Sequence, residues 1–305
     1  MAARETSLLT RRKRWHLRDA LDVHAKTGLD RRGVAISAAR EGPMAVFAND
    51  HIGNAIAFWG IYERDELELV FAFLAPFADR FAQGAALDVG ANIGNHTRYF
   101  AQRFRRVHAF EPHPLAFRLL AFNTERLDGV APHAFGLSDN HQSARLAEAS
   151  GNVGASHVAA GEEGVEIRLR RLDQCDLGDE PVALIKLDVE GLETAALRGG
   201  EATIARHRPV ILFEQLAEAF DGDETPAIRL LRKWNYRICW FDRAGEGGSL
   251  GAKLLRQLRF LLAGRPMRIA TAAKATRRTY TMMVAIPAEA AGAVFPADQR
   301  SIGSN

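Results

Sequence analysis

The sequence predicts an α/β fold built on a mostly parallel β-sheet. From residue 85 onward, short apolar segments of strand length alternate with segments of helical periodicity, which is typical of a parallel sheet covered by helices on both faces. A glycine-containing turn follows the first apolar segment, at the place where such sheets bind ligands. The last two apolar segments lack a crossover helix between them, so we expect one of these strands to run antiparallel.

The composition is that of a globular protein with a substantial core. The chain has 305 residues, of which 47% are hydrophobic and 25% charged, and both values are ordinary. Its formal net charge of +3 does not favour nucleic-acid binding. The two cysteines, Cys175 and Cys239, form no paired motif, which predicts a reducing cytoplasm without a disulfide framework or zinc site. No apolar run approaches the roughly 20 residues of a membrane helix, and no secretory signal is recognisable.

The N-terminal part is predicted to be an extension of the main fold. Residues 1–32 are polar and rich in arginine, and we expect a basic N-terminal arm. Residues 33–82 are predicted to form a small β/helical extension. Within it, short β-like runs in 33–60 are broken by turn residues, which predicts a β meander, while apolar residues in 65–82 recur at helical spacing.

The main domain is expected to span residues 83–290, with a basic insertion at 243–278 and a C-terminal tail at 291–305. A Gly/Ser-rich loop interrupts the alternation within 140–180. The expected strands are 85–89, 107–110, 131–137, 165–169, 183–189, 210–213, 237–241 and 280–286. The expected helices are 95–104, 114–127, 191–206 and 224–234.

The insertion is strongly basic and contains an amphipathic segment, 254–262. One interpretation is a surface helix that packs its leucines on the core. The other is a lid or interfacial helix, which would contact an anionic glycan, a phosphate-bearing acceptor or an anionic membrane surface through 253–278. The basic residues of this segment are Lys253, Arg256, Arg259, Arg265, Arg268, Lys274, Arg277 and Arg278.

The turn after the first strand reads Asp88-x-Gly90-x-x-x-Gly94. Gly90 allows the backbone to turn and approach a ligand closely, and Gly94 allows the next helix to begin against the strand. The carboxylate of Asp88 suits a cofactor that carries an ammonium and a sulfonium group. Ala91 and Asn92 stand where a dinucleotide fingerprint needs its second glycine, so the pattern favours S-adenosylmethionine over a nicotinamide cofactor. A turn without any ligand is the alternative.

Two further strand ends carry candidate cofactor ligands. Glu111 ends the second strand, 21 residues after Gly90, where an acidic residue can accept hydrogen bonds from both ribose hydroxyls. Ser138 and Asp139 end the third strand. They could cap a loop or bind the adenine amino group, and the sequence leaves both open.

The fourth strand carries charges on one side. Lys186, Asp188 and Glu190 alternate along it, so their side chains share a face. Buried charges are unfavourable unless they are paired or face a cleft. Glu214 adds a carboxylate at the end of the next strand. These residues therefore indicate either a charged pocket, or an internal Lys186–Asp188 ion pair with Glu190 at a helix N-terminus.

Several motifs together resemble the FkbM-type methyltransferase family. The resemblance covers roughly residues 60–242, and it is the order of the motifs that makes it specific. Segments 1–59 and 243–278 lie outside it, so substrate identity is not implied. The matching pieces are residues 88–97, 109–112, 137–139, 151–156, 186–193 and 197–199.

The resemblance implies a Rossmann-like, seven-strand class I methyltransferase sheet that binds S-adenosylmethionine. It also implies methyl transfer, usually to a hydroxyl of a sugar, glycan or natural product, so a small-molecule acceptor is expected and nucleic acid is not. The expected cofactor-binding residues are Asp88, Gly90, Asn92, Gly94, Asn95, Glu111, Ser138, Asp139 and Asp188. The expected catalytic residues are Asp188, Glu190, Lys186 and Glu214.

A hydroxyl acceptor benefits from a general base within hydrogen-bond reach. The candidates are Asp188, Glu190, Glu214 and His96, and Lys186 could orient an acceptor oxygen. The carboxylates are also hard oxygen ligands, but no spacing requires a metal ion and none is predicted. The alternative functions are a nucleotide- or nicotinamide-dependent oxidoreductase and a non-catalytic, methyltransferase-like binding module.

Overall fold

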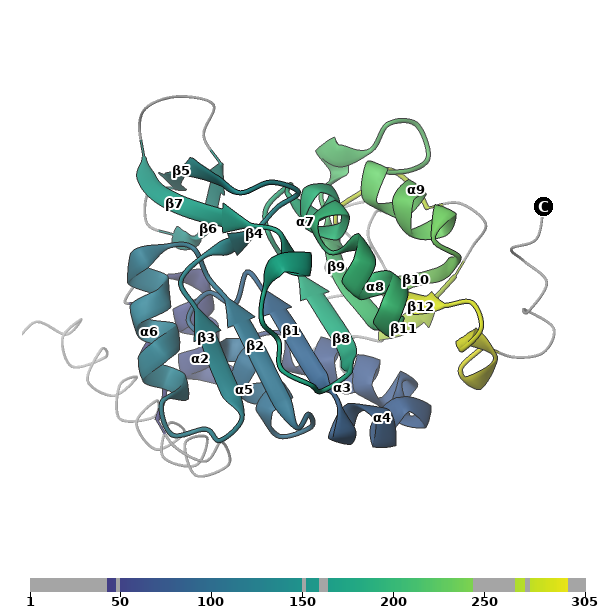
Figure 1. Cartoon of the computed structure of the whole chain (residues 1–305), viewed down its shortest axis with the longest axis horizontal. Coiled ribbons are helices and arrows are strands. Elements are labelled where there is room, and N and C mark those ends of the chain that lie inside the picture. The colour runs from purple at the N-terminus through teal and green to yellow at the C-terminus, as the bar shows by residue number, and fades with distance from the viewer. Residues whose placement is uncertain are drawn as a thin grey trace, which may run out of the picture.

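A computed structural model of the protein describes residues 43–47, 50–149, 152–158, 164–243, 267–271 and 275–295. Its centre is an eight-stranded sheet with the order β11-β10-β12-β9-β8-β1-β2-β3 (Figure 1). The strands are β1 (Ala85–Val89), β2 (Arg106–Phe110), β3 (Val130–His133), β8 (Val182–Leu187), β9 (Val210–Gln215), β10 (Tyr236–Arg243), β11 (Met267–Ala270) and β12 (Tyr280–Pro287).

The strand directions confirm a mostly parallel, Rossmann-like α/β sheet with an antiparallel last strand. β3, β2, β1, β8 and β9 pair in parallel, while β12 runs antiparallel to both of its neighbours, β9 and β10. The sequence predicted seven strands for this sheet, one fewer than the eight observed. β11 pairs antiparallel with β10 at the sheet edge, and it is formed by the end of the predicted basic insertion.

Both faces of the sheet are buried because successive strand residues alternate between two apolar clusters. Leu87 and Ile185 belong to the cluster beneath α7 (Glu193–Gly199), α8 (Glu201–His207) and α9 (Pro226–Lys233). Ala86 and Leu184 belong to the opposite cluster, with α3 (Arg64–Phe73), α4 (Ala78–Gln83) and α5 (Asn95–Ala101). This two-sided burial explains the nearly continuous apolar strands in the sequence.

Helix boundaries follow from caps and breakers in the sequence. α6 (Pro114–Thr124) begins after His113, whose ring accepts a hydrogen bond from Leu115 N. α9 begins after Thr225, whose hydroxyl accepts from Ile228 N. The helix expected at 191–206 is divided into α7 and α8 at Gly200, which lacks a side chain to favour helix.

A second sheet, with the order β4-β7-β5-β6, lies over the carboxyl ends of β1 and β2 (Figure 1). It consists of β4 (Gly136–Leu137), β7 (Val165–Arg170), β5 (Gln142–Ala149) and β6 (Asn152–Val158). The predicted strand at 165–169 is confirmed, but the single strand at 131–137 is wrong, because β3 and β4 belong to different sheets. The expected Gly/Ser-rich loop contains β5 and β6.

The β meander expected at 33–60 is wrong for residues 51–59, which form α2 (His51–Trp59). Asp50 Oδ2 accepts a hydrogen bond from Gly53 N at 3.0 Å and caps this helix. Residues 43–47 form no helix or strand. The helix expected at 65–82 is divided into α3, the 3₁₀ turn η1 (Ala75–Phe77) and α4, because Pro76 cannot continue an α-helix.

The ends of the chain are described only in part. The basic arm at 1–32 and the amphipathic segment at 254–262 lie outside the described residues, so both stay predictions. The expected tail begins within the fold, because Phe295 is buried in the apolar cluster that contains α3. No helix in the described part of the chain is long and apolar enough to cross a membrane.

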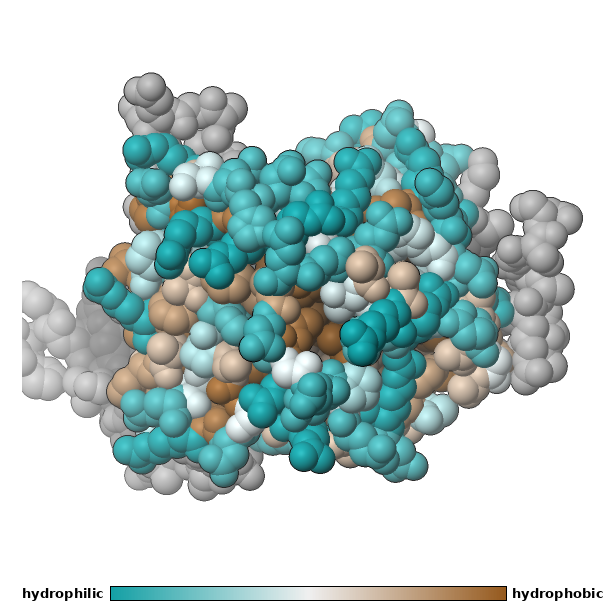
Figure 2. All heavy atoms as spheres, viewed as in Figure 1, coloured by the Kyte–Doolittle hydropathy of each residue, from teal (hydrophilic) through white to brown (hydrophobic). Residues whose placement is uncertain are grey.

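One face of the molecule is mainly hydrophilic (Figure 2). The large hydrophobic side chains that are exposed in the described residues, Leu115 and Phe122, both lie on α6. Isolated exposed apolar side chains are normal on soluble proteins, so they indicate no binding surface by themselves.

Candidate active site

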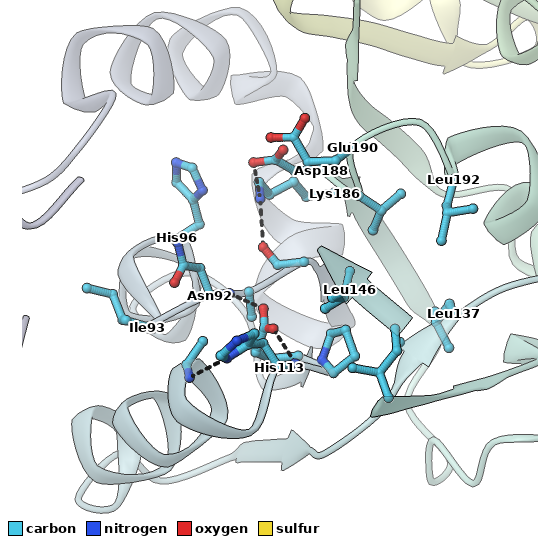
Figure 3. Close-up of a pocket in the computed structure, with 18 of the residues that line it drawn as sticks. Asn92, Ile93, His96, His113, Leu137, Leu146, Lys186, Asp188, Glu190 and Leu192 are labelled. Atoms are coloured by element: carbon cyan, nitrogen blue, oxygen red, sulfur yellow. Dashed lines mark hydrogen bonds and ion pairs between the residues drawn. The ribbon is translucent and has the colours of Figure 1, made fainter. Parts of the chain in front are cut away.

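A pocket of about 940 Å³, including its open mouth, lies at the carboxyl ends of β1, β2 and β8 (Figure 3). Its place is where open α/β sheets bind ligands. We call the part formed by Gly90, Asn92 and Glu111 the glycine-turn end. The part formed by Asp188 and Glu190, together with the neighbouring Glu214, is called the carboxylate end.

The glycine turn is shaped by contacts within the protein. Gly90 has φ +78°, and a Cβ there would lie 1.8 Å from the carbonyl oxygen of Asp188. Gly94 has φ +90°, and a Cβ there would lie 3.0 Å from Leu120 Cδ1 of α6. The close approach expected between Gly90 and a ligand is thus an approach to the end of β8. Gly94 packs against α6 rather than against the strand.

Glu111, at the glycine-turn end, is held by two backbone N–H groups. Its Oε2 accepts a hydrogen bond from Asn92 N at 2.8 Å, and its Oε1 accepts from His113 N, also at 2.8 Å. Burial raises the pKa of Glu111 to about 7, although both hydrogen bonds and nearby Lys186 oppose the rise. Each oxygen keeps a lone pair, so the carboxylate can still accept two hydrogen bonds from a ligand.

Lys186 connects the two ends of the pocket. Its Nζ lies 3.1 Å from Asp188 Oδ2 and 3.5 Å from Asp88 Oδ1. Burial alone would lower the pKa of Lys186, but the carboxylates of Asp188 and Asp88 outweigh it and raise the pKa. The internal Lys186–Asp188 ion pair considered from the sequence is therefore present, and both residues also line the pocket.

Asp88 does not line the pocket. It is completely buried, and its Oδ2 accepts a hydrogen bond from Thr97 Oγ1 at 2.6 Å. With Lys186 on its other oxygen, Asp88 holds the floor of the site in place. A direct contact between Asp88 and a cofactor stays a prediction.

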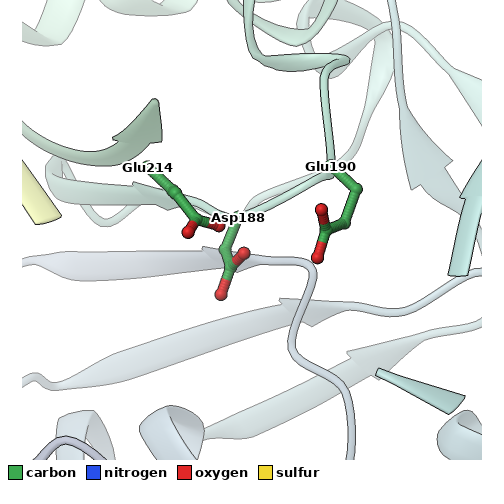
Figure 4. A group of neighbouring side chains, drawn as sticks. All are labelled: Asp188, Glu190 and Glu214. Atoms are coloured by element: carbon green, nitrogen blue, oxygen red, sulfur yellow. The ribbon is translucent and has the colours of Figure 1, made fainter. Parts of the chain in front are cut away.

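Three carboxylates meet at the carboxylate end (Figure 4). One oxygen each of Asp188, Glu190 and Glu214 lies within 4.8 Å of the others. Burial and the neighbouring Asp188 carboxylate raise the pKa of Glu214 to about 9. For Asp188, burial is outweighed by Lys186, which lowers the pKa. At neutral pH this pair therefore divides into a protonated Glu214 and an ionised Asp188.

Oxygen atoms at these separations could also bind a divalent cation. The absence of a metal ion from the reaction stays a prediction. Glu190 lines the pocket in a left-handed conformation, with φ +47°. Glu214 stands behind Asp188, on β9, and is not among the lining residues.

The other expected cofactor ligands differ in their positions. Asn92 lines the pocket, and its buried Oδ1 has no hydrogen-bond partner among the described residues. Asn95 also lines the pocket, but its side chain accepts from Tyr62 N and donates to Tyr62 O, at 2.9 and 3.1 Å. Ser138 and Asp139 follow β4 outside the lining; Ser138 Oγ donates to Asp139 Oδ1 at 3.3 Å.

Residues outside the sequence motifs complete the pocket. Ile52 of α2 and Tyr62, from the connection to α3, lie on one side, and no motif in the sequence pointed to them. The second sheet supplies an apolar wall, which the alternation of residues 165–169 could have indicated. Its lining residues are Leu146, Ile167 and Leu169.

His96, considered as a base from the sequence, also lines the pocket. It is only 6% exposed, and its Nε2 lies 3.5 Å from Glu63 Oε2. This Nε2 has no hydrogen-bond partner among the described residues. Glu63 is a further functional candidate that no sequence pattern indicated.

Fold and pocket together define a Rossmann-like α/β protein with a pocket at the carboxyl edge of its sheet. Residues 88–238 match the family model described as "Methyltransferase FkbM domain". This match confirms, for the segment that it covers, the resemblance to FkbM-type methyltransferases seen in the motifs.

Individual relatives share smaller parts of the chain. A "Hexuronic acid methyltransferase AglP" from Haloferax volcanii is 32% identical over 115 residues, 37% of this chain and 48% of the relative. The chain therefore spans about half the length of this curated relative.

Solved structures are more distant. A methyltransferase FkbM from Methylobacillus flagellatus KT gives a TM-score of 0.35 at 21% identity, covering 52% of this chain and 39% of that one. An rRNA methylase from Streptococcus thermophilus gives 0.39 at 9% identity, covering 72% and 97%. The family assignment rests on the sequence match and not on these scores.

Proposed function

We propose that the protein is an S-adenosylmethionine-dependent methyltransferase that methylates a hydroxyl group of a sugar or glycan. The observation that carries this proposal is the arrangement of Glu111 beside the glycine turn. Two backbone N–H groups hold its carboxylate, and its remaining lone pairs suit the two hydroxyls of a ribose. The match of residues 88–238 to a methyltransferase family supports the same conclusion over an oxidoreductase.

The residues of the pocket fit this cofactor. The apolar wall of the second sheet, with Leu146, Ile167 and Leu169, suits a flat adenine ring. Asn92 Oδ1 is a buried acceptor that lacks a partner among the described residues, and it suits the ammonium group of the cofactor. The carboxylate end suits a cationic sulfonium, because opposite charges attract strongly in a partly buried site.

When bound, S-adenosylmethionine supplies an activated methyl group on its sulfonium. Asp188, kept ionised by Lys186, is the group we assign to accept the proton of the acceptor hydroxyl. Lys186 fixes the position of that carboxylate. Alignment of reacting groups can lower a barrier by several kcal/mol, so this fixed geometry is itself a catalytic contribution.

The acceptor class is inferred from the relative. The curated relative from Haloferax volcanii is named a hexuronic acid methyltransferase, which supports a sugar acceptor for this chain. The expectation of a small-molecule rather than a nucleic-acid acceptor stays a prediction.

Calorimetric titration with S-adenosylhomocysteine tests the proposal. The titration is made at pH 8, above the raised pKa of Glu111. Glu111→Gln then replaces the carboxylate that would receive the ribose hydroxyls, and hydrogen bonds to charged groups contribute about 1.5–3 kcal/mol each. We therefore expect affinity to fall about 10- to 100-fold. Glu218→Gln is the matched control, because Glu218 is exposed and lies outside the pocket lining, and the affinity of this variant should equal that of the wild type.

Methyl transfer is then followed with a labelled methyl donor and a panel of sugars. Label should enter a sugar through an ether bond. Folded wild-type protein that does not bind the cofactor product at millimolar concentration would overturn the proposal. Equal affinities for wild type and Glu111→Gln would overturn the role of Glu111.

A further inference from the structure

One charged group of the proposed cofactor needs a cation in a pocket that is rich in carboxylates. S-adenosylmethionine carries a carboxylate on the same carbon atom as its ammonium group. The ammonium suits Asn92 Oδ1, but Glu111, Asp188 and Glu190 of the lining are themselves carboxylates. A ligand carboxylate among them is repelled unless a positive charge lies beside it. We therefore searched the described lining residues for that charge.

Three of the described lining residues can carry a positive charge: Lys186, His113 and His96. Lys186 is already held by two carboxylates, Asp188 at 3.1 Å and Asp88 at 3.5 Å. His113 caps α6, because its Nδ1 accepts a backbone N–H group at the start of that helix. His96 is thus the group that remains for a ligand carboxylate.

His96 lies in the first turn of α5 and contacts a carboxylate outside the pocket lining. Its Nε2 lies 3.5 Å from Glu63 Oε2, and the Glu63 side chain is only 13% exposed. Because a carboxylate only accepts hydrogen bonds, the nitrogen that faces it, Nε2, carries a hydrogen. Contacts of this kind are often long before a ligand binds. The ring borders the pocket (Figure 3), so its other nitrogen, Nδ1, is left for a ligand.

The side chain of Glu63 is directed to His96 and not to the helix that it precedes. Glu63 is the N-cap residue of α3, but its side chain makes no cap hydrogen bond. Its φ of +57° is rare for a residue with a side chain, and such strain persists where the surroundings enforce it, often at ligand sites. The side chain of Asn95 holds the preceding residue, Tyr62, by two backbone hydrogen bonds. The Glu63 carboxylate is therefore kept beside His96.

The other charges near His96 leave Glu63 as its electrostatic partner. Burial would raise the pKa of Asp188, but Lys186 and, less strongly, His96 lower it, so His96 and Asp188 interact across the pocket. Lys186 balances Asp188, whereas Glu63 lies beside His96 itself and stabilises a proton on the ring. The charged and titratable groups around His96, apart from Glu63, are Tyr62, Lys186, Asp188, Glu190 and Glu214.

We propose that His96 binds the carboxylate of the cofactor as an imidazolium, which donates Nδ1–H to the cofactor and Nε2–H to Glu63. This assignment rests on the function proposed above. Glu63 is a positioning residue, because it acts through His96, and it lies outside the family-matched residues 88–238. A neutral imidazole cannot donate two hydrogen bonds. A ring that is neutral before binding therefore takes up a proton from the solvent when the cofactor binds.

Calorimetry in buffers with different enthalpies of ionisation measures this proton. S-adenosylhomocysteine is titrated into the wild type at pH 7.5, beside decarboxylated S-adenosylhomocysteine, which lacks only the carboxylate. Both ligands carry the ribose, so proton exchange at Glu111, whose pKa burial raises to about 7, cancels in the comparison. An ordinary histidine is mostly neutral at this pH.

We expect S-adenosylhomocysteine to take up about half a proton or more beyond the decarboxylated ligand. It should also bind at least about tenfold more tightly, because it alone makes the charged hydrogen bond. The ratio of the two affinities should fall as the pH rises, since the ring must then be protonated at a greater cost.

Variants localise the proton. His96→Gln can donate one hydrogen bond but cannot take up a proton, so the difference in uptake between the two ligands should disappear. Glu63→Gln should reduce this difference and weaken binding of S-adenosylhomocysteine about three- to tenfold. Asp65→Asn is the matched control, because Asp65 is an exposed carboxylate two residues after Glu63. This variant should behave as the wild type does.

Equal affinity and equal proton uptake for the two ligands in the wild type would overturn the inference, whether or not the variants fold. A difference in uptake that persists in His96→Gln would also overturn it. Equal effects of Glu63→Gln and Asp65→Asn would refute the role of Glu63. Failure of both ligands to bind at millimolar concentration would refute the proposed function, whereas binding of both without a difference would refute only the role of His96.

Discussion

The two ends of the cofactor pocket hold their carboxylates in different ways. At the glycine-turn end, the two oxygens of Glu111 accept hydrogen bonds from the backbone N–H groups of Asn92 and His113. At the carboxylate end, Asp188, Glu190 and Glu214 come from two strands and a loop, and they face one another. Glu111 is thus held by hydrogen bonds. At the carboxylate end, Asp188 is instead held by its ion pair with Lys186.

This difference suggests separate roles for the two ends: one suits binding of the cofactor and the other suits selection of the acceptor. A carboxylate held by two backbone donors has a fixed direction, which suits a cofactor with an unchanging ribose. The carboxylate end holds a protonated Glu214 beside an ionised Asp188, and such a pair can change its protonation when a cation arrives, which would suit the part of a site that discriminates between acceptors. Three predictions test this comparison, beginning with the largest expected effect.

Gly90→Ala should disrupt the contact between the glycine turn and the backbone of Asp188, where the two ends of the pocket meet. The new Cβ would lie 1.8 Å from the carbonyl oxygen of Asp188, at φ +78°. The conformation costs roughly 1–2 kcal/mol, and overpacking adds roughly 1–3 kcal/mol or more. We expect a loss of about 4 kcal/mol in the free energy of unfolding, measured with denaturant.

Gly222→Ala provides the control for Gly90→Ala. Gly222 has φ +68°, and a Cβ there would meet nothing within 4 Å. The loss in free energy of unfolding for Gly222→Ala should therefore reflect only the cost of the backbone conformation. Equal losses for both variants would mean that the contact with Asp188 does not constrain the turn.

Lys186→Met should affect the carboxylate end without changing the backbone. It would leave buried Asp88 and the partly exposed Asp188 without their shared cation, and removal of one partner of a buried ion pair costs about 3–5 kcal/mol. We expect a loss near the lower limit, about 3 kcal/mol, in urea unfolding. The double variant with Asp88→Asn should recover part of it. Additive losses would show that Asp88 is not coupled to Lys186.

The pH dependence of stability should distinguish the two ends. The folded-state pKa of Glu111 is raised to about 7 and that of Glu214 to about 9. A raised carboxyl pKa stabilises the fold at acidic pH, and this contribution is lost as pH rises through the folded pKa. For Glu111 it amounts to roughly 3 kcal/mol or less, since one pKa unit corresponds to about 1.4 kcal/mol.

The measurement is urea unfolding of the ligand-free protein from pH 5 to pH 9. The difference in free energy of unfolding between wild type and Glu111→Gln should change with pH up to about pH 7 and then become constant. The difference for Glu214→Gln should continue to change up to about pH 9. Parallel curves for wild type and Glu111→Gln would show that burial does not perturb this carboxyl group.

Local sequence patterns predicted most of the central sheet. The apolar segments at β1, β2, β8 and β9 are continuous because both faces are buried, so periodicity and turn residues identified them. The patterns were misleading where one signal has two meanings. Asp50 precedes α2 and caps it, yet an Asn-Asp pair between apolar runs also predicts a turn of a β meander.

The residues of the candidate site also fall into two groups, those that local sequence patterns predicted and those that they did not. Glu111, Lys186 and Asp188 were predicted because they end buried strands of the sheet. Tyr62 and Glu63 could not be predicted, because their position depends on contacts with Asn95 and His96, more than thirty residues later in the sequence. No local pattern records such long-range contacts.

The clamp between Asn95 and the backbone of Tyr62 has a consequence for anyone who trims this protein. A fragment that starts at residue 88, where the family match begins, would discard α2, α3 and β1 up to Leu87, and with them a whole side of the pocket. Even a fragment that begins just before β1 would lack Tyr62, so the side-chain amide of Asn95 would lose its two hydrogen bonds to the Tyr62 backbone. The segment that matches the family is therefore smaller than the part of the chain that forms the pocket.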